Sequence, residues 1–342
     1  MRKFLWIFLI LLIVAAGIGY YGYNAIFAPN VTLAQDEQLI RIPTGFTYED
    51  VLLMLEDKEI IDNSRTFDQV ASLMDYKSSS IRSGQYEIKN NWSNKELVGL
   101  LRSGRQTPVN VTFNNLRKPE DVAGKISSYL EIDSLTLKEY FEHPSALEKA
   151  GLTPETFLSL FIPNTYQMYW NVSKEDILDR MITEHDKFWS KENRLKKAEK
   201  LNLTPEEVYT LASIVEKESL RNDEKTTIAG VYLNRLKQGI PLQADPTVVF
   251  ATGEFDLRRV LNKHLAYDSP YNTYLYAGLP PGPIYMPSIS SIDGVLNYNG
   301  HDYLYFCANP DQPGGHLFAA SLSEHNRNAA RYHRWLNARG IR

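Results

Sequence analysis

The hydrophobic pattern begins with one uninterrupted apolar run, residues 4–23, which reads FLWIFLILLIVAAGIGYYGY. As a helix this run would extend about 30 Å, which matches the hydrocarbon core of a bilayer. Arg2 and Lys3 precede it, and positive flanking residues favour the cytoplasmic side of a membrane. We therefore expect residues 1–3 in the cytoplasm, a single-pass anchor over residues 4–23, and the rest outside. A cleaved signal peptide is the alternative, but the run exceeds a usual signal core and no clear A-x-A site follows.

A linker, residues 24–37, leads to a small region, residues 38–106, in which strand and helix patterns alternate. The pattern predicts a strand (LIRIP), two helices, a second strand (GQYEIK) and a closing helix. Cap chemistry supports these helices, with N-caps expected at Thr47, at Ser64 or Thr66, and at Ser93. The order of elements resembles LysM, a small module that binds glycans containing N-acetylglucosamine. Glycan binding and a purely structural spacer both remain open for this subdomain.

Residues 107–342 form the larger predicted domain, which again mixes strands and helices. It opens with the strand VNVTFNN and continues with helical patterns, among them one long, highly charged helix over residues 173–201. We expect that helix to be solvated, with one packed face. Proline and glycine concentrate in GLPPGPIYMPS, residues 278–288, which predicts a rigid loop suited to form one wall of a cleft. The fold class is therefore α+β.

Composition and charge exclude several classes of function. The formal net charge is −4, and the scattered lysines and arginines give no basic surface of the kind that binds nucleic acid. A single cysteine excludes an internal disulfide, and the seven histidines show no metal-binding spacing. No G-x-S-x-G motif indicates a serine hydrolase. We therefore predict no metal, no cofactor and no nucleic-acid partner.

The stretch TLASIVEKES, residues 210–219, places an acid in line with an apolar stripe. Thr204 is the expected N-cap of this helix, with Pro205 as its first residue. At about 100° per residue, one face collects the apolar side chains of Val208, Leu211, Ala212 and Val215. Glu218 follows Leu211 by seven residues and falls within about 20° of it. The sequence therefore predicts that Glu218 continues the packed face.

The two acids near the end of this helix are expected to differ. Glu216 lies about 160° around the helix from Glu218, so we expect Glu216 to be solvated. A carboxyl group at the end of an apolar stripe loses hydration, which raises its pKa and suits it to general acid catalysis. Cleavage of a glycosidic bond requires such an acid. From the residues alone, an exposed Glu218, or one paired with a cation such as Arg221, remains the alternative.

Several segments resemble the endolytic murein transglycosylases, the YceG-like family of membrane-anchored enzymes that act on peptidoglycan. The similarity is densest in LASIVEKES, VYLNRLKQGIPLQADPTV, YNTYLYAGLPPGPI, YLYF and GGHLFAASLSEHN. The family's catalytic glutamate precedes a serine or threonine, which matches Glu218 and Ser219. Two segments depart from the family pattern. YMPS, residues 285–288, stands where the family continues A-N-P-G, and NNLRKPED, residues 114–121, matches the usual strand-to-helix turn only loosely.

The resemblance implies roles for further residues. Substrate contacts are expected from Ser219, Gln243, Asp245, Thr247, Tyr271, Asn272 and Tyr274. Support of the site is expected from Asn234, Arg235 and His316. Asp245 is also a candidate second catalytic carboxylate, although D-P-T is typical of a helix or turn start, the role that we favour for it.

The resemblance also implies a reaction. The bond between N-acetylmuramic acid and N-acetylglucosamine would be cleaved within peptidoglycan glycan strands. Glu218 would protonate the glycosidic oxygen and then act as base on the muramic C6 hydroxyl, which gives a 1,6-anhydro end. The family further implies the cytoplasmic membrane of a bacterium, with the catalytic domain extracytoplasmic and penicillin-binding protein synthases nearby. A two-carboxylate peptidoglycan hydrolase and a non-catalytic wall-binding tether are the alternatives.

Overall fold

A computed structural model describes residues 2–257 and 259–339. The chain divides into two compact units. Unit 1 comprises residues 1–111, 129–132 and 166–173, and unit 2 comprises residues 112–128, 133–165 and 174–342. The division falls within two strands that pair with each other, β3 (Val109–Phe113) and β4 (Asn164–Met168). Helices and small two-stranded sheets make up both units, in agreement with the predicted mixture of helix and strand.

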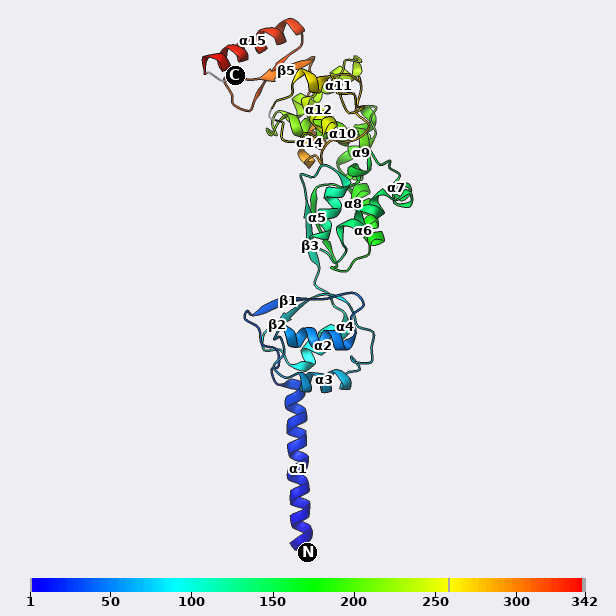
Figure 1. The fold of residues 1–342 in the computed structure, drawn as a ribbon, viewed down its shortest axis with the longest axis vertical. Helices are drawn as coiled ribbons and strands as arrows, with labels where there is room; N and C mark the ends of the chain where they lie inside the picture. The colour runs from blue at the N-terminus through cyan, green and yellow to red at the C-terminus, as the bar shows by residue number, and fades with distance from the viewer. Residues whose placement is uncertain (1, 258, 340–342) are drawn as a thin grey trace. The chain divides into compact units, whose positions relative to one another are not determined.

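Unit 1 contains the strand, helix, helix, strand, helix order that the sequence predicts (Figure 1). Its elements are α1 (Arg2–Phe27), β1 (Glu37–Ile42), α2 (Tyr48–Asp57), α3 (Ser64–Leu73), β2 (Gly84–Lys89) and α4 (Asn94–Ser103). The strands β1 and β2 pair antiparallel, from Glu37 opposite Lys89 to Ile42 opposite Gly84. Inward-facing apolar side chains of both strands and of the three short helices form one core. The likeness to LysM rests on this order alone and stays a prediction.

The helix caps of unit 1 follow local chemistry, with one correction. Thr47 and Ser93 each close a capping box with the acid three residues on, as expected. Asn63, however, caps α3, because its side chain accepts from the backbone N–H of Thr66. Ser64 and Thr66 are therefore inside the first turn and not at the cap. The prediction overlooked that asparagine one position earlier places its oxygen at the required spacing.

The apolar N-terminal run forms α1, which continues past the predicted residue 23 to Phe27. Within the described residues, Lys3–Phe27 is a helix long and apolar enough to cross a membrane, and its side chains from Phe4 to Tyr20 are exposed. The last turn is different, because Ala25 is buried and its carbonyl accepts from Asn94 Nδ2 at 2.9 Å. The helix is thus docked into unit 1 at one end and uncovered along the rest, which is compatible with a single-pass anchor.

Unit 2 is built around α10 (Pro205–Glu218). The other elements of unit 2, coloured from teal to red in Figure 1, are α5 (Pro119–Ser127), α6 (Ser134–Glu142), α7 (Pro144–Ala150), η1 (Phe157–Leu160), α8 (Lys174–Ser190), η2 (Lys191–Asn193), α9 (Arg194–Lys200), α11 (Lys225–Lys237), α12 (Asp245–Thr252), α13 (Asn262–Leu265), α14 (Ile289–Leu296), β5 (Tyr305–Ala308), β6 (His316–Ala319) and α15 (Leu322–Ala338). β5 and β6 pair antiparallel. α10 begins at the predicted Thr204 capping box and packs against α9, α11, α12 and α14.

The long charged helix expected over residues 173–201 is two helices. α8 ends at Ser190 and α9 begins at Arg194, because Glu192 and Asn193 adopt left-handed backbone conformations with φ of 55° and 57°. Such conformations interrupt a right-handed helix. Arg194 is buried at the break and pairs with Asp293 at 2.9 Å. Helical periodicity alone could not reveal this break, which a tertiary ion pair accompanies.

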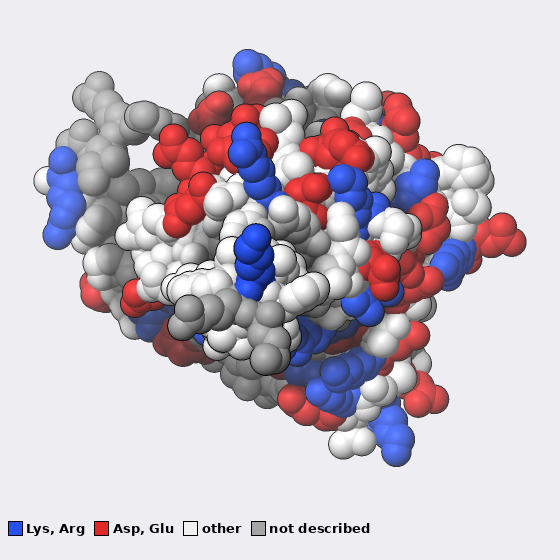
Figure 2. Space-filling model, turned by 90° about the horizontal axis from the view of Figure 1, so that it is seen from below, with Lys and Arg blue, Asp and Glu red and all other residues white. Residues whose placement is uncertain are grey.

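Charged side chains of both signs are interspersed on the face of the molecule seen in Figure 2. This mixture accords with the formal net charge of −4.

Candidate active site

Glu218 is the last residue of α10, where the helix leaves the core and meets two cavities. The larger cavity has a volume of about 680 Å³ and is lined by Arg117, Lys217, Glu218, Asp245, Pro246, Val249, Phe250, Phe255, Leu257, Arg259, Val260, Ile284, Tyr285 and Tyr332. The smaller has a volume of about 280 Å³ and is lined by Glu218, Tyr232, Arg235, Leu242, Gln243, Asp245, Tyr274, Tyr305, Phe306 and His325. Glu218 and Asp245 line both cavities. A chain of sugars that occupied the two cavities would therefore pass over these two carboxyl groups.

The surroundings of Glu218 favour its protonated form. Burial is the largest cause, a hydrogen bond from Tyr232 opposes it, and the charge of Asp245 adds to it, which together raise the pKa of Glu218 to about 7. A carboxyl group with this pKa can hold a proton near neutral pH and donate it. The carboxylate that remains can then accept a proton from another group. The protonation behaviour expected from the sequence is thus present at Glu218.

Tyr232, which sequence reasoning missed, is the direct partner of Glu218. It lies on α11, is 1% exposed, and its hydroxyl donates to Glu218 Oε1 at 2.6 Å. Burial and the neighbouring Glu218 raise the pKa of the Tyr232 hydroxyl well above its ordinary value, so Tyr232 remains a donor. No spacing in the sequence signals this contact, because it depends on how α10 and α11 pack.

Asp245 and Tyr274 form a second pair on the wall shared by the cavities. The Tyr274 hydroxyl donates to Asp245 Oδ1 at 2.6 Å. α12 does begin at Asp245, but the Asp245 carboxylate makes no cap bond, because Ala244 occupies the N-cap position. The helix start that we favoured from sequence is therefore confirmed, with Ala244 as its N-cap. The carboxylate instead points to the site, where its charge acts on Glu218.

The expected supporting residues link the loops around the smaller cavity. Arg235 donates to the carbonyls of Pro241 and Leu304, and to Gln243 Oε1 at 2.6 Å. Gln243 needs this support because its backbone is left-handed, with φ of 53°, a conformation that costs a non-glycine residue about 1 kcal/mol. Asn234 donates to the carbonyls of His301 and Tyr303. His316 lines neither cavity and contacts Glu224 through Nδ1 at 2.7 Å.

Three of the expected substrate contacts have their polar groups engaged inside the protein. Ser219 is 4% exposed and its hydroxyl accepts from the Arg221 backbone N–H. Thr247 is fully buried and donates to the Ala244 carbonyl. Asn272 is also fully buried, and its amide donates to two backbone carbonyls in residues 265–267. Burial leaves these groups out of reach of a sugar, so their role is to hold the walls.

The remaining expected contacts differ in their access to the cavities. Gln243, Asp245 and Tyr274 all line the smaller cavity. Tyr271 lines neither one, and its ring packs against Phe250 with centroids 4.8 Å apart. Tyr271 therefore supports the wall of the larger cavity from behind, through Phe250.

The comparisons with known proteins agree with this geometry. The model of the YceG-like family matches residues 40–331. The chain belongs to the YceG-like family. Proteins named endolytic murein transglycosylase from Streptococcus pneumoniae and Bacillus subtilis are 26% and 29% identical to this chain, over 97% and 86% of its length. The chain spans 65% of the pneumococcal relative and 84% of the Bacillus relative. A solved structure of a yceG-like protein from Listeria monocytogenes is 28% identical, with a TM-score of 0.57, and covers 85% of this chain and 98% of its own.

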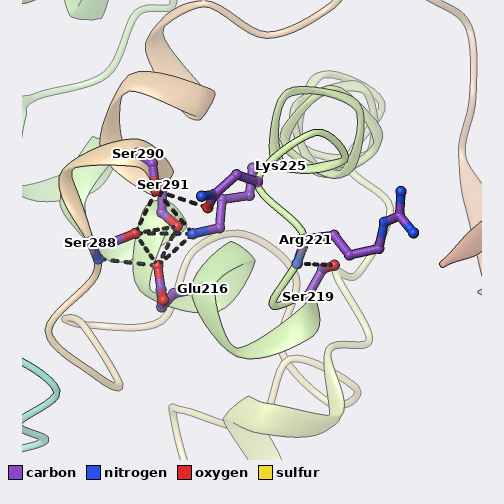
Figure 3. A network of polar contacts seen from close by, with 8 residues as sticks. Glu216, Ser219, Arg221, Lys225, Ser288, Ser290 and Ser291 are labelled. Atoms are coloured by element: carbon purple, nitrogen blue, oxygen red, sulfur yellow. Dashed lines mark hydrogen bonds and ion pairs between the residues drawn. The ribbon is translucent and has the colours of Figure 1, made fainter. Parts of the chain in front are cut away.

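Glu216 in this YceG-like protein is not solvated, contrary to the prediction. Its carboxylate accepts from Lys225 Nζ at 3.0 Å and from the hydroxyls of Ser288 and Ser291, both at 2.5 Å (Figure 3). Lys225 is only 3% exposed. Burial opposes ionisation of Glu216, but the hydrogen bonds from Ser288, Ser291 and Lys225 outweigh it and hold the pKa of Glu216 below its ordinary value. The prediction assumed one packed face on α10, whereas every residue from Val208 to Val215 is buried.

The second packed face of α10 attaches the loop over residues 278–288. The Ser213 hydroxyl accepts from the backbone N–H of Ile284 at 3.0 Å, and one turn later Glu216 accepts from the backbone N–H of Ser288 at 3.1 Å. Ile284, at the first attachment, and Tyr285, between the two, line the larger cavity. Glu216 therefore holds a cavity wall and does not share a pocket with Glu218, as their helical separation required.

Glu216→Gln should destabilise this YceG-like protein, because it leaves the buried Lys225 ammonium without its counter-ion. Breaking a buried pair in this way costs about 3 kcal/mol or more. The free energy of unfolding in urea, measured on the full chain in detergent, tests this. Glu199→Gln is the matched control, since Glu199 is exposed on α9 and its replacement should change stability by less than about 0.5 kcal/mol.

The effect of Glu216→Gln should also depend on pH. The folded pKa of Glu216 is lowered, so its stabilising contribution is complete above the unfolded value, about 4.3, and is lost as the pH falls through the folded value. The unfolding free energies of the wild type and of Glu216→Gln should converge in acid. Equal stability of the two proteins at neutral pH would contradict the assignment.

Proposed function

We propose that this chain is an endolytic murein transglycosylase, which cleaves the bond between N-acetylmuramic acid and N-acetylglucosamine within peptidoglycan strands. The observation that carries the proposal is the carboxyl group of Glu218, with its pKa raised to about 7, at the junction of two cavities. A site that continues on both sides of the acid suits a bond in the interior of a strand. Relatives that bear this name support the same activity.

Glu218 would act first as acid and then as base. Because Tyr232 donates to Oε1, the other oxygen, Oε2, would carry the proton to the glycosidic oxygen. The resulting carboxylate keeps the Tyr232 hydrogen bond and would then remove the proton of the muramic C6 hydroxyl. Attack of C6–O on C1 closes the 1,6-anhydro ring, so the bond that breaks at C1 is replaced within the same sugar. An intramolecular nucleophile of this kind has a large effective concentration.

A two-carboxylate hydrolase is the second candidate, because Asp245 lines both cavities with Glu218. In such an enzyme Asp245 would activate a water molecule and leave a reducing end. Against this, the Tyr274 hydroxyl already occupies one oxygen of Asp245 at 2.6 Å. The two reactions begin with the same protonation and differ in the product.

Glu218→Gln should lower turnover by about 10²- to 10⁴-fold, since it keeps the shape of the side chain and removes the transferable proton. Digestion of purified peptidoglycan, followed by mass spectrometry, gives both rate and product. Wild-type fragments should end in anhydro-muramic acid, one water lighter than hydrolytic ends. Glu199→Gln, which removes an exposed acid that lines neither cavity, should digest at the wild-type rate.

Digestion in water labelled with ¹⁸O separates the two candidates. Reducing ends that take up the label would establish the hydrolase and exclude the transglycosylase. Asp245→Asn adds a second criterion, because it should abolish turnover in a two-carboxylate hydrolase. In the transglycosylase it should leave turnover and shift its pH dependence to lower pH, since the Asp245 charge helps to raise the pKa of Glu218.

Tyr232→Phe should move the alkaline limb of kcat/KM to higher pH. The Tyr232 hydrogen bond lowers the pKa of Glu218, so its loss raises that pKa above about 7 and keeps the acid protonated further into the alkaline range. One hydrogen bond to a charged group corresponds to a shift of about one pH unit. Tyr276→Phe is the matched control, because Tyr276 also donates to a carboxylate, Asp268, but lines neither cavity. An unmoved limb in Tyr232→Phe would remove Tyr232 from the mechanism.

We also propose that α1 is a retained single-pass anchor with the catalytic unit extracytoplasmic, in the cytoplasmic membrane of a bacterium. The docking of Ala25 against Asn94 supports retention, because cleavage after this turn would leave the Asn94 amide without its carbonyl partner. A reporter fused after residue 30 should be active only outside the cytoplasm, and the mature chain should keep its N-terminal helix. A mature chain that starts near Ala28 would contradict the anchor. A neighbouring penicillin-binding protein stays a prediction of the family resemblance.

A further inference from the structure

The two segments that depart from the family pattern meet at the larger cavity. The backbone N–H of Met286, in the YMPS segment, donates to the carbonyl of Leu116, in the NNLRKPED segment, at 2.7 Å. Arg117 follows this contact and Tyr285 precedes it, and both side chains line the larger cavity. The YMPS and NNLRKPED segments are therefore in contact, and together they form one part of the cavity wall.

Two cationic side chains, those of Lys217 and Arg117, lie over the ring of Tyr285. Lys217 Nζ lies 4.5 Å from the ring centroid, and Arg117 Cζ lies 6.0 Å from it. Arg117 also lies over Phe255, with Cζ 4.2 Å from that centroid. The aromatic rings hold both cations at the cavity through contact with their faces. Lys217 directly precedes Glu218 on α10, so this cationic wall adjoins the acid.

Within the described residues neither cation is close enough to a carboxylate to form an ion pair, although the charge of Glu216 acts on Lys217 from a distance. Partial desolvation at the cavity and then the charge of Arg117 lower the pKa of Lys217, as expected for like charges that face one cavity. Arg259 adds a third cationic side chain to the lining. The acids of the same lining offset only part of this positive charge, because Asp245 supplies one carboxylate against three cations and Glu218, with a pKa of about 7, is partly protonated near neutral pH.

We infer that Arg117 and Lys217 form a subsite for carboxylates of the stem peptide carried by the muramyl residue. This inference rests on the proposed function and defines its substrate further, as peptide-bearing strands with free carboxylates. The larger cavity, about 680 Å³, then receives the muramyl residue and the start of its peptide, and the smaller, about 280 Å³, receives the leaving N-acetylglucosamine. Carboxylates are the anions that peptidoglycan itself offers at this position, because sugar hydroxyls and acetamide groups are neutral. Charge-assisted hydrogen bonds from arginine and lysine are the stronger class of such contacts.

The test compares two substrates that differ only in charge. Uncrosslinked strands with free stem carboxylates are digested beside the same strands after conversion of these carboxylates to amides. Wild-type kcat/KM should fall about tenfold on the amidated strands, from the loss of charged contacts. The variants Arg117→Gln and Lys217→Gln, and the pair together, should lose up to about tenfold on free-carboxylate strands, mainly through KM, and almost nothing on amidated strands.

Lys237→Gln is the matched control, because Lys237 also lies over a tyrosine ring, Tyr298 at 5.3 Å, but lines neither cavity. The kcat/KM of Lys237→Gln should equal that of the wild type on both substrates. Lys217 is exposed, so Lys217→Gln alone keeps the test valid if Arg117→Gln fails to fold. If the variants lose kcat/KM equally on both substrates, the subsite is excluded. It is also excluded if amidation of the strands leaves the wild-type kcat/KM unchanged.

Binding separates failure of the subsite from failure of the proposed function. The full-length Glu218→Gln protein, which lacks the transferable proton, is titrated with both kinds of strand. A preference for free carboxylates that disappears when Lys217→Gln is added supports the subsite, even if the wild type yields no anhydro ends. Anhydro ends formed without any such preference would support the proposed function and exclude the subsite.

Discussion

The dehydration of one carboxyl group, that of Glu218, is the constraint on which the larger unit depends. Every residue of α10 from Val208 to Val215 is buried, so the helix emerges from the core only in its last turn. A carboxyl group at that point is screened from water by the protein and still faces both cavities. The core packing of α10 therefore sets the proton affinity of Glu218, and Tyr232 and Asp245 adjust it in opposite directions.

The same helix carries a second acid, Glu216, whose surroundings favour its ionised form. Glu216 is also desolvated, but serine hydroxyls and Lys225 bond to its charged form, and its pKa moves down where that of Glu218 moves up. One consequence is mechanical, because Glu216 and Ser213 attach the loop over residues 278–288 to α10. Gly282 permits a second close approach of the same loop, to the segment before η1, since a Cβ at that position would lie 1.9 Å from the Glu155 carbonyl oxygen. The cavity wall and Glu218 thus share α10 as their support.

The sequence predicted the features of α10 that depend only on residues within the helix and its cap. The capping box at Thr204 and the helical phase of Glu218 follow from spacing within α10, and the structure has both. Tyr232 and Lys225 could not be found in this way, because their roles depend on how α11 packs against α10. Thr247 and Asn272 had the right chemistry for a sugar, but burial, which no short motif encodes, turned them inward. The break before Arg194 could not be predicted for the same reason, since Asp293, the ion-pair partner of Arg194, is distant in sequence.

The cations of the larger cavity bear on the acid through the substrate that they would bind. Glu218 takes its raised pKa from burial and from the charge of Asp245, against the Tyr232 hydrogen bond. Stem carboxylates bound at Arg117 and Lys217 would bring further negative charge toward Glu218, which raises the pKa of a carboxyl group. Peptide-bearing strands would then keep the acid protonated to higher pH in the complex than a strand without anionic groups. The substrate would in this way complete the electrostatics of the site that cleaves it.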